Sequence, residues 1–250
     1  MIIDSNGKEC QEVNFHIGAS TTTTRQWDIY VTQYNCGQED TAGPPGCLQY
    51  MTGTSGTVSI FNFNPSNTAA AAGTDTSTTH LQNQHYEICF RRESGTKLFP
   101  IIFQIQHLKS HLSFFKGYCY ICYIPFNSIT GASSYGLGVA TADDAIAKSA
   151  QGTSCIGDYI VVPQGATSTV AALTTVSAIA NERFCGRYLN HITNTADNAS
   201  VCSRIYPFRI GVNFDDTELC TNVAMTQLCE ADTAPGGIIG FSLNYVQASC

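Results

Sequence analysis

The sequence is poor in charged residues. Only 12% of its 250 residues are Asp, Glu, Lys or Arg, about half the usual share in globular proteins. Acidic residues outnumber basic ones, 19 to 12, which gives a net charge of −7. Because binding to a phosphate backbone requires clustered Lys and Arg, this composition argues against a nucleic-acid partner. Thr, Ser, Asn, Gln and Gly supply the polarity instead, which favours strands and turns over long solvated helices.

Long hydrophobic runs are also missing. The segment 96–117 (TKLFPIIFQIQHLKSHLSFFKG) comes closest, but lysines and histidines interrupt it. Its apolar part falls far short of the roughly 20 residues that a membrane-spanning helix needs. The first ten residues, MIIDSNGKEC, have neither the basic nor the apolar region of a signal peptide. We therefore expect no membrane span, and we expect the chain to begin inside a longer precursor or to have a misassigned start.

Cysteine, by contrast, is abundant. Twelve cysteines are spread along the chain. An even and widely distributed set is typical of proteins folded in an oxidising compartment. The sequence thus predicts a secreted, extracellular protein with up to six disulfides. The sequon Asn198-Ala199-Ser200 agrees with this location and marks Asn198 as a candidate glycosylation site.

Apolar and polar residues alternate in several short segments. The clearest are 27–31, 58–60, 86–90, 208–214 and 241–245. A period of two with one apolar face is typical of half-buried antiparallel strands. We predict an all-β fold, an antiparallel β-sandwich braced by disulfides. Several such strands on each side of Pro125 favour two packed or tandem units, 8–125 and 126–250.

Four motifs follow one another in the second half. They are CIGDYIVV with PQG (155–165), RFCG (183–186), PFRIGVNFDD (207–216) and GFSLNY (240–245). This order resembles the CUB domain, a jelly-roll β-sandwich found in extracellular proteins. The first half resembles the divergent module that precedes such a domain in uncharacterised secreted arthropod proteins, through WDIYVTQY (27–34), GCLQYMTG (46–53) and HLQNQHYEICFRR (80–92).

Some disulfide pairings can be predicted. The resemblance implies a bond between Cys155 and Cys185. Spacing along the chain indicates Cys36–Cys47, which would close a proline-containing loop, and Cys220–Cys229; the other pairings stay open. Cys119 and Cys122 form a C-x-x-C pair, but its aromatic flanks suit a strand. We therefore expect structural disulfides there rather than a redox or zinc site.

The resemblance also implies a possible calcium site. Many CUB domains bind Ca²⁺ through acidic side chains at one end of the sandwich. Asp158 matches the acidic residue before the strand tyrosine, and Asp216 or Asp215 matches the acid after the late strand. The family's further glutamate, upstream of the Asp-Tyr strand, has no clear match here, and Asp143 and Asp144 are the only nearby candidates. The alternative is that these residues are solvated turn acids.

No catalytic signature appears in the sequence. There is no G-x-S-x-G elbow, and no histidine has a recognisable catalytic flank. We predict a secreted interaction module without catalytic activity, whose partner is an extracellular protein or matrix component. A structural component of an extracellular matrix or cuticle-like assembly is the alternative. A secreted hydrolase, or a domain accessory to one, is a third and weaker reading.

The segment 96–117 interrupts the pattern of its surroundings. Removing it joins RRESG to YCYICY, as in the related proteins, and its ends can be encoded as the borders of a 66-nucleotide in-frame intron (22 × 3). We therefore expect 96–117 to be a non-native insertion. The alternatives are a true loop insertion that packs on the sandwich and a strand that binds a partner.

Overall fold

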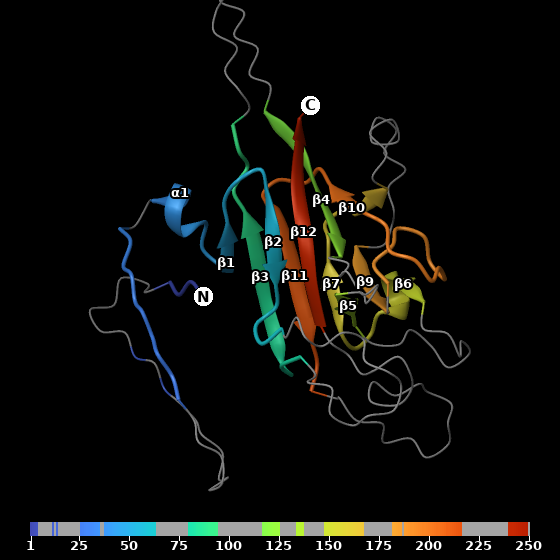
Figure 1. The fold of residues 1–250 in the computed structure, drawn as a ribbon, viewed down its shortest axis with the longest axis horizontal. Coiled ribbons are helices and arrows are strands. Elements are labelled where there is room, and N and C mark those ends of the chain that lie inside the picture. Colours follow the sequence, from blue (N-terminus) through green and yellow to red (C-terminus); the bar gives the residue numbers. More distant parts are fainter. Residues whose placement is uncertain are drawn as a thin grey trace, which may run out of the picture.

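The computed structural model describes residues 1–4, 12, 14, 26–35, 38–63, 80–94, 117–125, 134–137, 148–167, 182–186, 188–216 and 240–249. These residues form two β-sheets packed face to face (Figure 1). The helical segments of the described residues are α1 (Glu39–Ala42) and the 3₁₀ turn η1 (Gly152–Ser154), both too short to cross a bilayer. The expected all-β sandwich is confirmed.

Sheet A has the strand order β1-β3-β11-β7-β9-β6. β1 runs parallel to β3, and the other neighbours in this sheet are antiparallel. The bounds are β1 Cys47–Met51, β3 Gln84–Phe90, β11 Phe208–Phe214, β7 Tyr159–Val161, β9 Arg183–Gly186 and β6 Ser149–Gln151.

Sheet B has the order β2-β12-β4-β10-β8, and β5 also pairs with β12. All of its pairings are antiparallel. The bounds are β2 Ser55–Ser59, β12 Gly240–Ser249, β4 Tyr118–Pro125, β10 Val201–Ser203, β8 Ala166–Thr167 and β5 Tyr135–Gly136.

Among the described residues, the main apolar core fills the space between the sheets. β11 alternates strictly, with its four apolar residues buried and the residues between them partly exposed. Across the core, β12 contributes Phe241, Leu243 and Tyr245, and β4 contributes Ile121 and Tyr123. This is the period of two that the sequence showed, with one face of each strand turned inward.

The division into two units is wrong for the described strands. Sheet A places β1 and β3, from the first half, beside β11 and β7 from the second. Sheet B places β2 and β4 on either side of β12. The described strands from before and after residue 125 thus share both sheets and one core, so they belong to a single sandwich.

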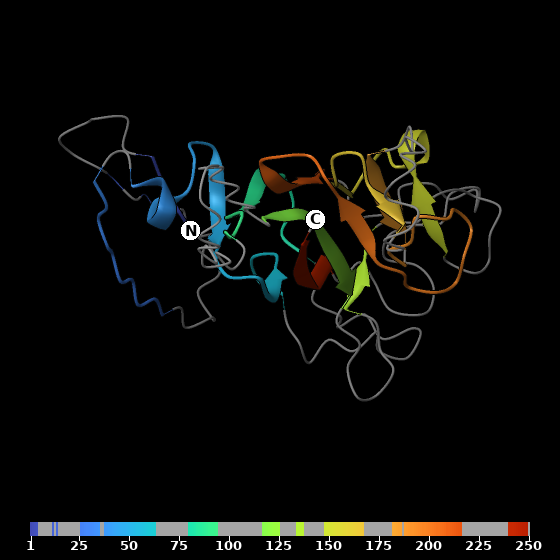
Figure 2. The same cartoon turned by 90° about the horizontal axis from the view of Figure 1, so that it is seen from above.

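The segment 26–35 also departs from expectation. Its alternating residues predicted a strand, yet the structure shows an extended stretch without strand pairing, beside the sandwich in both views (Figures 1 and 2). Ile29, Tyr30 and Val31 are 51%, 93% and 72% exposed. Alternation supplies only a propensity, and a strand also requires an edge to pair with. The edge strand β1 is contacted by a different segment: Ile2 donates its N–H to the carbonyl of Leu48 on β1 (2.7 Å).

Residues 96–116 lie outside the described part of the chain, so the insertion hypothesis remains a prediction. Their flanks are described. β3 ends in sheet A and β4 begins in sheet B, and Arg92 Nε donates a hydrogen bond to the carbonyl of Tyr118 at 2.6 Å. The two ends of the connection therefore lie next to each other, close enough for a much shorter connection to join them.

Candidate functional site

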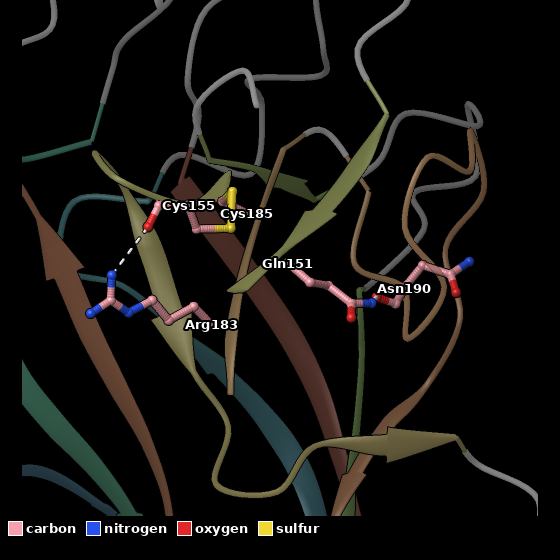
Figure 3. Close-up of a disulfide and its surroundings, with 5 residues drawn as sticks. All are labelled: Gln151, Cys155, Arg183, Cys185 and Asn190. Atoms are coloured by element: carbon pink, nitrogen blue, oxygen red, sulfur yellow. Dashed lines mark hydrogen bonds between the residues drawn. A yellow bond between two sulfur atoms is a disulfide. The ribbon is translucent and has the colours of Figure 1, made fainter. Parts of the chain in front are cut away.

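The disulfide between Cys155 and Cys185 is present. It connects the segment that precedes β7 with strand β9. Arg183 lies beside it, and its Nη1 donates a hydrogen bond to the Cys155 carbonyl at 3.4 Å (Figure 3). Gly186 follows the second cysteine with a φ of +87°, and a Cβ there would overlap the carbonyl oxygen of Lys148. The RFCG motif thus ends in glycine because only glycine fits this close approach.

The expected pair Cys36–Cys47 is wrong. Cys47 bonds to Cys89 instead, which links β1 to β3. The short spacing along the sequence favoured Cys36 as the partner. In the fold, however, Cys47 on β1 and Cys89 on β3 lie on adjacent, paired strands. Residue 36 lies outside the described part of the chain, as do Cys220 and Cys229, whose pairing stays a prediction.

The C-x-x-C motif is structural, as expected. Cys122 on β4 bonds to Cys202 on the neighbouring strand β10, and Cys119 is disulfide-bonded as well. The Cys122–Cys202 bond belongs to a small apolar cluster with Tyr120, separate from the main core. Both cysteines of the motif are therefore in disulfides, and the one at Cys122 links two neighbouring strands of sheet B.

Three loops meet at one end of sheet A, the lower end in Figure 1. β11 is antiparallel to both β3 and β7, and its last residues pair with the first residues of those strands, Phe214 with Gln84 and Asn213 with Tyr159. The segments just before β3 and β7 and just after β11 are consequently brought together. They carry His80, Asp158 and Asp215.

Asp158 is the centre of this loop cluster. Its side chain is 1% exposed, and that of His80 is fully buried. Asp158 Oδ2 lies 2.8 Å from His80 Nε2, and Oδ1 accepts a hydrogen bond from the backbone N–H of Asp215 at 2.9 Å. Oδ1 is therefore hydrogen-bonded to the backbone, whereas Oδ2 is in close contact with the imidazole without a hydrogen bond of good geometry among the described residues.

The other acids proposed from the sequence have different surroundings. Asp215 takes part through its backbone, since its carbonyl also accepts from the N–H of Asn83 at 2.8 Å. Asp216 is exposed. Within the described ranges, no group of three or more His, Cys, Asp or Glu side chains could hold a metal ion. Sequence reasoning missed His80, because nothing in the chain order links it to Asp158.

A second feature is a groove on the outer face of sheet A. It encloses about 560 Å³ and crosses β3, β11 and β7. Its floor includes Gly211, opposite Val161, where an added Cβ would lie 3.3 Å from the valine Cβ. Because glycine leaves no side chain between the flanking strands, the sheet surface is hollowed there.

Polar side chains surround this floor. Arg209 Nη1 lies 3.3 Å from Glu87 Oε1, and both side chains are about two-fifths exposed. His85 Nδ1 and Asn213 Oδ1 are 3.4 Å apart, and Glu182 also lines the groove. Tyr86 also borders the groove, but its side chain packs against the core, where burial raises the pKa of this tyrosine to about 12. The groove offers hydrogen-bond donors, acceptors and both signs of charge.

Comparison with known proteins identifies the family. The model of the animal CUB domain matches residues 44–248, which include all the strands of both sheets up to Ala248. Comparisons with curated proteins and with solved structures gave no match. CUB domains are mostly extracellular, typically mediate protein interactions and are generally non-enzymatic. The two-sheet sandwich, its disulfides and this match together show that the chain belongs to the animal CUB domain family.

Proposed function

We propose that this protein is a secreted, non-catalytic interaction module that contacts an extracellular protein or matrix component through the groove on sheet A. The groove itself is the observation that carries the proposal. A hollowed sheet face with partly exposed charged and amide side chains presents several directional contacts on a rigid scaffold. Specific interfaces commonly combine such polar groups with a central region from which water is excluded on binding.

Secretion is supported by the disulfides. Three of them brace the described strands, across β1–β3, β4–β10 and the segment before β7 to β9. Such bonds persist where the surroundings are oxidising. Asn198 lies between β9 and β10, is partly exposed, and accepts a hydrogen bond from the N–H of Leu189 through Oδ1. Its glycosylation remains part of the proposal.

A charge reversal in the groove tests the binding face. We expect Arg209→Glu to weaken binding to any partner found in a panel of purified extracellular and matrix proteins by about tenfold or more, as for a central charged contact. The midpoint of thermal unfolding should change little, because the Arg209–Glu87 pair is solvated and contributes at most about 1 kcal/mol. Surface plasmon resonance and differential scanning fluorimetry measure the two effects.

Asn244→Glu provides the matched control, since this residue lies on β12 in the opposite sheet and its side chain accepts from the Thr57 hydroxyl at the surface. It should leave binding unchanged. The groove is the wrong face if Asn244→Glu weakens binding and Arg209→Glu does not.

The exposed apolar side chains of 26–35 favour a second candidate function, a structural role in an extracellular assembly. Ile29 and Val31 could cover apolar surface of another copy. Sedimentation velocity over a concentration series separates the two proposals. Species that grow with concentration and disappear in Ile29→Lys/Val31→Lys support assembly, whereas a monomer at every concentration supports the interaction module.

A further inference from the structure

The pair formed by His80 and Asp158 stands where the CUB family resemblance placed a calcium ligand. Asp158 is the residue that matched, but its carboxylate faces an imidazole at 2.8 Å. The His80 ring is held in place by Phe214, edge-on at 4.2 Å between ring centroids. Since both side chains are buried, the imidazole cannot leave the carboxylate without opening this end of the sandwich.

The donor set does not fit a calcium ion. Ca²⁺ takes six to eight oxygen ligands, mostly carboxylates, carbonyls and water, and imidazole nitrogen suits softer metals. Here one carboxylate oxygen faces a ring nitrogen, and the other accepts from a backbone N–H. Asp215 donates its backbone N–H to Asp158.

A buried carboxylate nevertheless requires compensation. Removing a carboxylate from water is costly unless hydrogen bonds or an opposite charge replace the lost hydration. His80 is suited to this task, because its buried Nε2 lies 2.8 Å from Oδ2, where an imidazole can replace part of the lost hydration. The backbone N–H of Asp215 completes the compensation on the other oxygen.

We propose that His80 takes the place of the cation in this CUB domain. The imidazole fastens the loop before β3 to the loop before β7, and Asp215 ties in the end of β11. The loop cluster is therefore closed by the chain's own side chains, and its stability is independent of calcium. This inference concerns the loop cluster at the end of sheet A, not the groove, and it does not depend on the proposed binding function.

Calcium-dependent unfolding of the full chain tests the proposal. The wild-type midpoint should agree within about 1 °C in excess CaCl₂ and in EDTA, whereas a bound ion at 100 times its Kd would raise it by roughly 5–10 °C. In His80→Glu, two carboxylates face each other without a counter-charge. We expect its midpoint in EDTA to fall by roughly 10 °C, and calcium to restore at least half of that loss. Terbium luminescence should show saturable binding in this variant and none in wild type.

His85→Glu is the matched control, because His85 is exposed on β3, the strand that follows the loop carrying His80. It should gain no calcium response. His80→Gln covers the case in which His80→Glu does not fold, and should lower the midpoint clearly more than His85→Gln. The proposal is overturned if the wild-type midpoint rises with calcium and that rise is lost in Asp158→Asn. It is also overturned if His80→Glu folds but does not respond to calcium, or if His80→Gln is as stable as the wild-type protein.

Discussion

At the scale of single residues, the core contains a buried tyrosine, Tyr123, whose hydroxyl lies among apolar side chains that cannot form a hydrogen bond with it. Tyr123 on β4 is fully buried and packs against Phe90, with ring centroids 5.3 Å apart. Its hydroxyl has no hydrogen-bond partner in the described part of the chain. Burial raises the pKa of Tyr123 well above its ordinary value of 10.0. The ring therefore stabilises the core while its hydroxyl costs desolvation free energy.

Tyr123→Phe should consequently leave the protein as stable as wild type or more stable by about 1 kcal/mol at pH 7. It should also reduce alkaline sensitivity. Because the folded state holds the tyrosine proton more tightly than the unfolded state, the associated stability is present below pH 10 and is lost as pH rises above it. Urea denaturation between pH 8 and about pH 11 measures both effects.

Tyr30→Phe is the control, since Tyr30 is 93% exposed, and it should change neither quantity. Some alkaline loss should remain in Tyr123→Phe, because burial also raises the pKa of Tyr86 to about 12. A loss of more than 1 kcal/mol in Tyr123→Phe at pH 7 would mean that the hydroxyl has a strong partner.

At the scale of elements, β1 is the edge strand most dependent on a covalent link. It pairs with β3 in parallel, with a register irregularity between Cys47 and Gln49, and forms one end of sheet A. Parallel pairing is slightly weaker per residue than antiparallel pairing. The disulfide Cys47–Cys89 therefore has the task of holding β1 against its neighbour.

Replacing both cysteines, Cys47→Ala with Cys89→Ala, should lower the free energy of unfolding by roughly 2–4 kcal/mol. Amide hydrogen exchange should accelerate first in β1 (Cys47–Met51), while β11 and β12 in the sheet centres keep their protection. Uniform acceleration across both sheets would contradict this local role. Cys155→Ala with Cys185→Ala is the comparison, and its effect should centre on β7 and β9.

At the scale of the whole molecule, the shared core determines cooperativity. Each sheet contains strands from both halves of the chain, and one cluster of buried residues spans them. Neither half can bury its apolar faces without the other. A chain built from two tandem sandwiches would instead have two cores with separate stabilities.

Differential scanning calorimetry should therefore show one unfolding transition, with a calorimetric enthalpy equal to the van't Hoff enthalpy. Two resolved transitions would restore the two-unit arrangement. A separately expressed 126–250 segment should not fold, because it lacks β2 and β4 beside β12 and β3 beside β11. The full chain measured under the same buffer conditions is the control.

Local patterns were enough to predict much of the fold. The alternation in 86–90, 208–214 and 241–245 predicted strands that the structure contains, because burying one face of a strand imposes a period of two on its residues. The same pattern failed in 27–31, which pairs with no strand among the described residues. Alternation describes a strand's two faces but says nothing about its edges.

The sequence by itself thus determined the fold class, the CUB motifs and, through the RFCG resemblance, the pairing of Cys155 with Cys185. Only the tertiary structure decided which distant segments meet. It joined the two halves into one sandwich, moved the partner of Cys47 from residue 36 to residue 89, and placed His80 against Asp158. The reason is physical: local sequence sets which face of a strand is apolar, whereas strand order and register, which the whole core selects, set the neighbours of each loop.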